Sequence, residues 1–317
     1  MHEPSVAADH SSVFFFKSPL LPVIVCSLLW GSAFPAIKTV YQNWDAQGLE
    51  KSLPIIFLFA GVRFSLSGAS LLVLGKNLKS ELRLTSWRLI AGLALAQTFI
   101  QYLFFYQAVS VSSASLAALL VATGSFWWML LAPLIQKTPW PSPTQWFGLM
   151  LGGLGVVLAI YKPGAGAGNP VLGAFFMLTA TASGAIAIII FAKIKPTMSA
   201  INATGLSLLL GGIGLTLIGG QALWKIGEMF DHSSTLATLW LAFVSATAFS
   251  IWNHLSTIFP VTLLASYRFL IPICGVSEAL VFLKTESAGW GFMIGGTLVV
   301  TSMVLAKNNS SDRKTNL

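Results

Sequence analysis

Pro163-Gly-Ala-Gly-Ala-Gly-Asn-Pro170 divides the 317-residue chain into two parts. We do not expect a helix to continue through this stretch, because proline removes a helical hydrogen bond and glycine disfavours the helix. Long apolar runs precede it at residues 19–37, 54–74, 88–108, 112–135 and 145–161, and others follow at 171–192, 200–221, 236–256, 260–283 and 289–306. Each run approaches the ~20 apolar residues that cross a bilayer as a helix. The sequence therefore predicts an all-α integral membrane protein with about ten transmembrane helices, five on each side of the break.

The composition favours a membrane protein in the same way. Hydrophobic residues make up 55% of the chain and charged residues 9%, with a mean hydropathy of +0.79. Soluble proteins carry about 25% charged residues, so this chain cannot cover its surface with charge. The runs also lack the alternation of apolar and polar residues that marks an outer-membrane β-barrel.

The lysine and arginine residues predict the orientation, because they gather in the cytoplasmic segments of membrane proteins. With a cytoplasmic N-terminus, the inner segments contain Lys17, Lys76, Lys79, Arg83, Arg88, Lys137, Lys193, Lys195, Lys307, Arg313 and Lys314, and the outer ones contain only Lys38, Lys51, Lys162, Lys225 and Lys284. We therefore expect an inner-membrane protein of the cell with both termini in the cytoplasm. The placement of these cations between apolar runs also argues against nucleic-acid binding, despite the net charge of +8.

An odd number of helices in each half means that the second half crosses the membrane in the opposite sense. Such five-plus-five inverted-topology repeats are a recurring transporter architecture. The predicted organisation is a cytoplasmic tail at 1–18, a first repeat at 19–162, a linker at 163–170, a second repeat at 171–306 and a cytoplasmic tail at 307–317.

Several short motifs occur in order along both halves. They are Leu29–Lys38, Ala122–Phe126, Gly205–Gly212, Ser245–Asn253 and Phe269–Val276. Together they resemble the EamA-type transporters of the drug/metabolite transporter superfamily over residues 20–306. The resemblance implies ten helices in two inverted repeats around a central cavity, and the movement of small solutes, commonly amino acids. The chain departs from the Gly-Glu pair that often closes spans four and nine of the family, since Gln136-Lys-Thr-Pro139 and Leu283-Lys-Thr-Glu286 stand there.

Charged side chains within the apolar runs need a reason, because each costs about 2.5–3.5 kcal/mol on insertion scales. Glu278 is a candidate for proton coupling, or else a carboxylate near the outer interface that is solvated or bonded to a neighbouring helix. Arg268 could hold a substrate carboxylate with two parallel hydrogen bonds, or extend to the cytoplasmic headgroups. At a rise of about 1.5 Å per residue, these two lie about 15 Å apart on one helix and cannot pair. Arg63 faces the same choice with less to recommend it as a ligand.

Polar residues in two other runs are candidates for a substrate cavity. Gln97 and Gln101 lie one helical turn apart, followed by Tyr102, and lipid would not tolerate this stripe facing outward. They line the cavity or bond to adjacent helices. Asn253 and His254 fall on the eighth run, which the resemblance places beside the cavity; a neutral histidine there binds substrate, moves a proton or simply packs.

Two further candidates for the substrate cavity lie where prolines kink or interrupt the predicted helices. Trp30 precedes Pro35, a kinking proline, and is expected in the cavity wall, while Pro272 interrupts the ninth run and frees backbone carbonyls for a substrate. Cys26 and Cys274 lie inside apolar runs and are expected to be buried thiols. The sequence contains no pattern for a metal, a cofactor or a catalytic nucleophile, so an enzyme is not expected.

These observations favour a secondary transporter that exports small polar metabolites, possibly amino acids, by alternating access. No nucleotide-binding motif is present that would suggest an ATP-driven pump. The alternatives are an integral-membrane enzyme or lipid-modifying protein, and a non-transporting membrane receptor. The expected partners are a small-molecule substrate and the lipid bilayer, and a homodimer is left open.

Overall fold

A computed structural model of the chain describes residues 18–136, 140–161, 168–259, 264, 267–268 and 270–312. Residues 163–167 of the predicted linker and most of the predicted tails lie outside the described residues. Within the described ranges the regular structure is helical, with one isolated β-bridge between Ser112 and Gly168.

The first half contains five helical segments. They are α1 (Leu20–Ala46), α2 (Leu53–Leu74), the series α4 (Trp87–Leu93), η1 (Ala94–Ile100) and α5 (Gln101–Val111), the pair α6 (Ala114–Leu120) and α7 (Thr123–Gln136), and α8 (Pro143–Tyr161). A short helix, α3 (Leu78–Leu84), connects the second segment to the third. The third segment contains a π-helical turn at η1, a distortion that often accompanies functional sites.

The second half repeats this series of long helices. They are α9 (Pro170–Ile194), α10 (Ala200–Ile218), α12 (His232–Ile258), α14 (Leu270–Phe282) and α15 (Trp290–Asp312), with the short η2 (Gly220–Lys225) and α11 (Ile226–Met229) between α10 and α12. Local signals start these helices. Asn169 accepts a hydrogen bond from the Leu172 amide before α9, and Asp231 does so from the Ser234 amide before α12. Both are N-caps, which satisfy amides that have no partner inside the helix.

Among the described residues, seven helical segments are long and apolar enough to cross a membrane. Three shorter apolar helices, at Pro143–Ala159, Leu270–Phe282 and Trp290–Ser302, fall on the remaining predicted spans. The prediction of an apolar, all-helical membrane protein is confirmed, whereas the inverted repeat stays a prediction.

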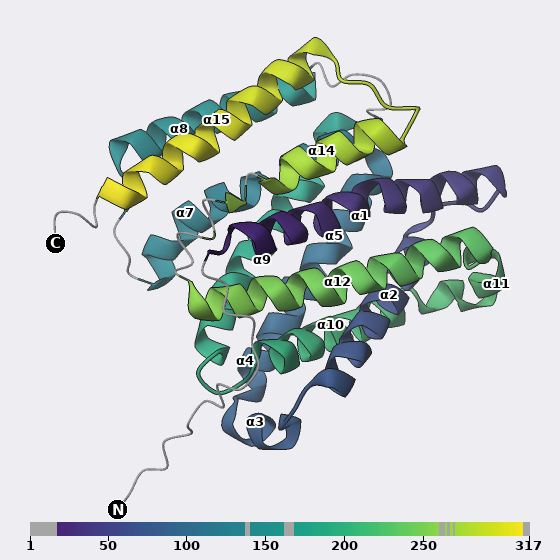
Figure 1. The fold of residues 1–317 in the computed structure, drawn as a ribbon. Coiled ribbons are helices and arrows are strands. Elements are labelled where there is room, and N and C mark those ends of the chain that lie inside the picture. Colours follow the sequence, from purple (N-terminus) through teal and green to yellow (C-terminus); the bar gives the residue numbers. More distant parts are fainter. Residues whose placement is uncertain are drawn as a thin grey trace, which may run out of the picture.

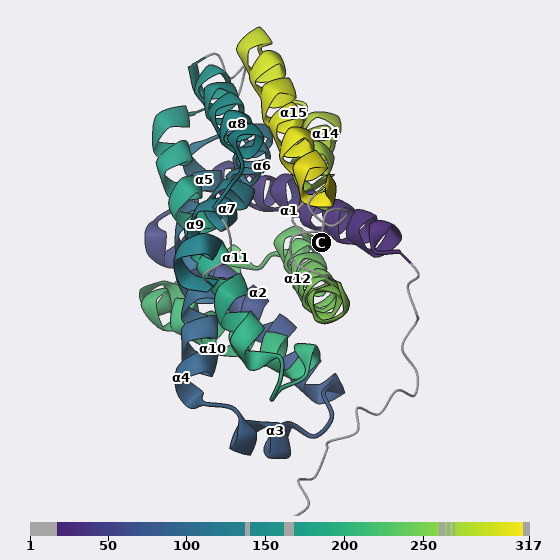
Figure 2. The same cartoon turned by 90° about the vertical axis from the view of Figure 1, so that its left-hand side faces the viewer.

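The helices lie side by side, with α8 and α15 paired at one edge and α2 and α10 at the opposite edge (Figure 1). α1, α12 and α14 lie between these pairs (Figure 1), and Figure 2 shows the same arrangement after a turn of 90°. The start of α1 and the end of α15 both point to the left of Figure 1.

Glycines allow the closest helix contacts, as is common in membrane proteins. A side chain on Gly68 of α2 would collide with the backbone of Leu209 in α10. A Cβ on Gly155 of α8 would lie 2.5 Å from the Gly295 carbonyl oxygen of α15. Both edge pairs of helices therefore depend on small residues.

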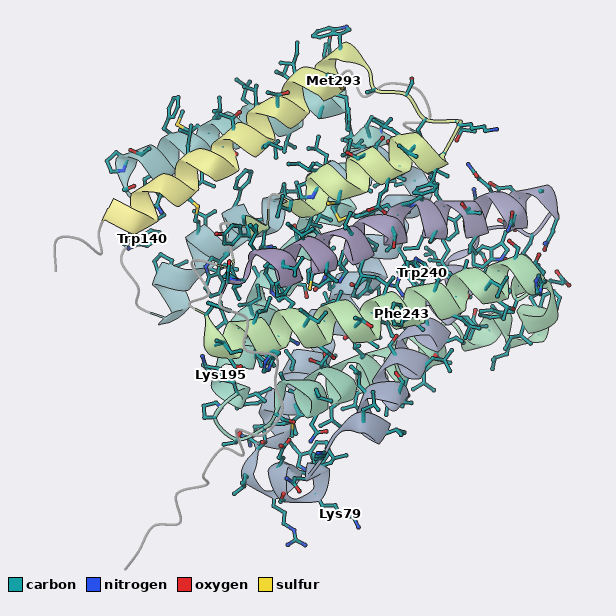
Figure 3. The ribbon with its side chains drawn as sticks, in the orientation of Figure 1. Lys79, Trp140, Lys195, Trp240, Phe243 and Met293 are labelled. Carbon is teal, nitrogen blue, oxygen red and sulfur yellow. The ribbon has the colours of Figure 1, made fainter. Side chains whose placement is uncertain are left out.

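Large apolar side chains remain exposed on the outer faces. Phe243 of α12 and Met293 of α15 are 54% and 57% exposed, and they project from the outside of the bundle (Figure 3). An apolar surface of this kind is stable against lipid and not against water.

Candidate functional site

A cavity of about 940 Å³, with the solvent at its open mouth included, lies between the two halves of the chain. Its walls come from α1, α2, η1, α5, α9, α12 and the start of α14. The polar lining residues are Arg63, Gln97, Gln101, Thr181, Asn253 and Arg268, and the aromatic ones are Trp30, Phe34, Tyr102, Phe105, Phe249 and Trp252. The site is therefore an apolar, largely aromatic space with a few polar groups, which is typical of small-molecule sites.

Six of the nine predicted site residues line this cavity: Trp30, Gln97, Gln101, Tyr102, Asn253 and Arg268. His254, Pro272 and Glu278 do not belong to the lining. The role of each residue in binding or coupling stays a prediction.

The geometry of helices explains the three exceptions. His254 follows Asn253, and successive helical residues point about 100° apart, so both cannot face the same space. The His254 Nε2 atom is buried, and none of the described residues forms a hydrogen bond with it. Pro272 is buried in the first turn of α14, where a missing amide proton costs little. Glu278 lies farther along α14 and faces α1, since a Cβ on Gly31 would lie 2.9 Å from its Oε1 atom.

The two glutamines occupy the cavity in different ways. Gln97 lies in the π-helical turn and is 5% exposed, and its buried Nε2 atom finds no hydrogen-bond partner in the described part of the chain. Gln101 begins α5 and rests against Gly184 of α9, where a Cβ would lie 2.8 Å from the glutamine Oε1 atom. Gly184 therefore leaves the space in which the Gln101 amide lies.

Asn253 and Thr181 are held by neighbouring helices. The Asn253 Nδ2 atom donates a hydrogen bond to Thr204 Oγ1 in α10 at 2.7 Å. The hydroxyls of Thr181 and Thr123 lie 2.9 Å apart and join α9 to α7. These bonds fix polar atoms at defined points of the wall, as a selective site requires.

Arg63 is fully buried and connects three helices. It donates from Nε to the Leu241 carbonyl at 3.1 Å, from Nη1 to Tyr106 Oη at 2.5 Å and from Nη2 to Ser245 Oγ at 2.8 Å. Its guanidinium also lies 4.6 Å from the ring centroid of Phe64. Arg63 was not among the site residues predicted from the sequence, although a charged residue well inside an apolar run indicates a buried polar site. All its bonded partners are neutral, so its positive charge is not cancelled locally.

Arg268 makes a different set of contacts. Its guanidinium lies 5.8 Å from the ring centroid of Trp252, within the range of a cation–π interaction. A Cβ on Gly124, at the start of α7, would lie 3.1 Å from its Nη2 atom. Its side chain makes no hydrogen bond or ion pair with any residue that the structure describes. The donors of the Arg268 side chain are therefore available to a solute.

A second, smaller pocket of about 530 Å³, with the solvent at its mouth included, adjoins the cavity. The two share Ile188, Trp252, Asn253 and Arg268 as lining residues. The smaller pocket also reaches the exposed Lys195 after α9, at the left end of the bundle in Figure 3. The cavity therefore continues toward the end where α9 and α12 terminate.

The opposite end is filled by aromatic side chains. Trp44 stacks edge-on against Phe59 with ring centroids 5.3 Å apart, and Phe59 contacts Tyr106 at 5.8 Å and Phe230 at 6.3 Å. Trp44, Phe59 and Tyr106 are completely buried. A solute in the cavity would have to displace this cluster to leave by that end.

Two charged side chains hold the turn between α5 and α6 beside that cluster. Lys38 of α1 donates from Nζ to the Val109 and Ser112 carbonyls at 2.9 and 2.6 Å. Glu286, after α14, accepts from the amides of Ala114 and Ser115 at 2.6 and 2.9 Å. A cation thus meets a helix C-terminus and an anion meets a helix N-terminus, both favourable pairings with the helix dipole. We call this arrangement the Lys38–Glu286 clamp.

The sequence of residues 17–161 matches the model of the EamA-like transporter family. The first half is similar to EamA-like transporters. This match confirms the resemblance seen in the motifs of that half, and EamA-like proteins are membrane transporters. A solved structure, described only as the crystal structure of a protein, aligns with 91% of this chain and 98% of its own at a TM-score of 0.61 and 14% identity. That likeness shows the fold alone. No curated protein sequence matches the chain.

Proposed function

We propose that this protein is a secondary transporter that exports small polar metabolites across the inner membrane by alternating access. The observation that carries the proposal is the cavity between the halves, which has polar groups fixed in an aromatic wall and continues toward the end where α9 and α12 terminate. This arrangement fits one state of a transporter whose site is reached from each side in turn. The class includes the amino acids expected from the sequence.

The pattern of helix contacts supports an inverted repeat. α1 packs against α12 and α14, while α9, its counterpart in the second half, packs against α5 and α7. Because α5 and α7 are the counterparts of α12 and α14, exchanging the halves reproduces these contacts. α2 packs against α10, its own counterpart in the second half, and α8 likewise packs against its counterpart α15. Rocking of one half against the other would then open the second end by the same kind of movement.

The proposed direction follows from the basic residues. Lys195 lines the smaller pocket, and Lys193 lies in the last turn of α9. Lys76, Lys79 and Arg83 lie on or just before α3, which bonds through Glu81 to Ser199 at the start of α10. The predominance of lysine and arginine favours this end as cytoplasmic, so both termini would be in the cytoplasm. Loading from the cytoplasm is what an exporter needs.

The chain also offers little for catalysis. Among the residues that the structure describes, no group of three or more His, Cys, Asp and Glu side chains is placed to hold a metal ion. The polar groups of the cavity are mainly amides and guanidinium groups, which bind solutes and are poor nucleophiles.

Flux in proteoliposomes tests the proposal. The purified protein should move members of a metabolite panel faster than empty liposomes, and Gln101→Ala should slow that flux. Gly153→Ala on α8 is the matched control, because a Cβ there meets no atom within 4 Å. The proposal fails if no member of a panel of anions, zwitterions, cations and neutral metabolites moves, with or without a pH gradient, through folded protein.

A further inference from the structure

The charge of the cavity is one-sided. Arg63 and Arg268 both line it, and none of the described residues that line either pocket is acidic. The hydrogen-bond partners of Arg63 are neutral, and Arg268 has no side-chain bond to a described residue. A guanidinium in a space of low dielectric is stabilised by an anion at hydrogen-bond distance.

The start of α7 adds to this positive potential. Helix N-termini carry a partial positive charge, and Gly124, the second residue of α7, lies against the guanidinium of Arg268. Two positive groups in contact repel each other unless an anion comes between them. Ser125 and Gly124 already use their amides in the turn from α6, so Arg268 is the main donor to such an anion.

Gln97 provides a second, independent indication of a ligand. Its Nε2 group is a buried donor without a partner among the described residues, and leaving such a donor unsatisfied is costly. Because Gln97 lines the same cavity, a solute that carries an acceptor would satisfy it. Both observations call for a negatively charged or strongly accepting group.

The remaining wall describes the rest of the solute. Trp30 lies 5.4 Å from Phe249 and 5.5 Å from Trp252, centroid to centroid, and the ring planes are inclined by 71° and 56°, so these three rings form one angled aromatic wall. Such a wall packs against an apolar body. The ammonium group of an amino acid would find no carboxylate in this lining, and it would be repelled by two guanidinium groups.

We propose that the cargo is an organic anion, with its carboxylate on Arg268 and its apolar body against Trp30 and Trp252. This inference rests on the proposed function and narrows it, since it selects anions over zwitterions and cations within the class of small polar metabolites.

Three probes with the same phenylethyl body test the charge preference: 3-phenylpropionate is an anion, phenylalanine a zwitterion and phenethylamine a cation. Their binding to the protein in lipid nanodiscs is followed by the quenching of tryptophan fluorescence. We expect 3-phenylpropionate to bind at least about tenfold more tightly than phenylalanine, and phenethylamine to bind least, because a charged hydrogen bond contributes a factor of about ten or more.

Variants assign the preference to a residue. Arg268→Gln should weaken the binding of 3-phenylpropionate about ten- to a hundredfold and leave the binding of phenethylamine unchanged or tighter. Arg268→Lys keeps the positive charge but loses the paired guanidinium donors, so its affinity for 3-phenylpropionate should lie between those of the unaltered protein and Arg268→Gln. Lys225→Gln at the other end of the bundle is the charge-matched control. Binding is compared only among variants whose melting temperature equals that of the unaltered protein. If Arg268→Gln does not fold, the affinity of Arg268→Lys for 3-phenylpropionate decides the test.

The possible outcomes separate this inference from the proposed function. Equal binding of the three probes, preference for the zwitterion or cation, no binding of any probe, or no effect of both Arg268 variants would overturn the anion assignment. If other metabolites were still moved in proteoliposomes, the proposed transport function would stand without the anion assignment. Tight, Arg268-dependent binding of 3-phenylpropionate without flux of any solute would support the anion site and contradict transport.

Discussion

Removal of the Glu286 carboxylate should open the end of the cavity that the aromatic side chains fill. In the Lys38–Glu286 clamp, this carboxylate accepts two amide hydrogen bonds at the start of α6, and we expect both to break when that end opens. Hydrogen bonds to a charged group contribute about 1.5 kcal/mol or more each, and water competes for the half-buried Glu286, so roughly 2 kcal/mol is a fair net value. Glu286→Ala should then raise the ratio of outward-open to inward-open protein about 30-fold.

Thiol labelling from outside measures this ratio. Gln101→Cys, in a background that lacks Cys26 and Cys274, places a thiol in the cavity. Its reaction with a membrane-impermeant reagent applied to intact cells should be slow, and Glu286→Ala should accelerate it about 30-fold. Glu286→Gln keeps one acceptor and loses the charge, so it should accelerate the reaction about fivefold.

The control is Glu228→Ala, which removes an exposed carboxylate from α11 at the same end. The described residues provide no hydrogen-bond partner for Glu228. If Glu286→Ala labels no faster than Glu228→Ala, the Lys38–Glu286 clamp does not hold that end closed. The Glu286 carboxylate then only stabilises the start of α6.

Three further changes have defined expected outcomes. Gly184→Ala should displace the Gln101 amide, because its Cβ would lie 2.8 Å from Oε1; we expect about tenfold weaker substrate binding with an unchanged melting temperature, measured beside Gly153→Ala. Glu278→Gln should preserve substrate exchange and abolish accumulation driven by a pH gradient; accumulation like that of the unaltered protein would make the carboxylate structural and turn attention to His254→Gln. A reporter that is active only outside the cytoplasm should stay silent when fused after Leu317, and a strong signal would overturn the predicted orientation.

The positions of the membrane helices could be predicted closely because they depend on runs of apolar residues. The run predicted at 54–74 corresponds to α2 at Leu53–Leu74, and the run at 171–192 to α9 at Pro170–Ile194. The ends were less predictable. α1 continues to Ala46, well past the predicted 37, because Lys38 and Asn43 stay helical by bonding to other segments.

The cavity was predictable where polar side chains repeat along one helix face. Gln97 and Gln101 could not both face lipid, and both line the cavity. Single polar residues gave no such direction, because membrane helices are apolar on every side and no hydrophobic face fixes their rotation. For this reason one sequence could not show that Asn253 lines the cavity while His254 does not, or that Glu278 points to α1.

The two uncompensated arginines of the cavity also bear on the energy source for transport. A site that carries an anion moves net charge, so the membrane potential acts on its cargo directly. At 100 mV, negative inside, one elementary charge gains about 2.3 kcal/mol in leaving the cell, which sustains a concentration ratio of about fiftyfold. An exporter of this kind is electrogenic, so the membrane potential contributes to its driving force beside any pH gradient. Its flux should follow an imposed potassium diffusion potential even where no pH gradient exists.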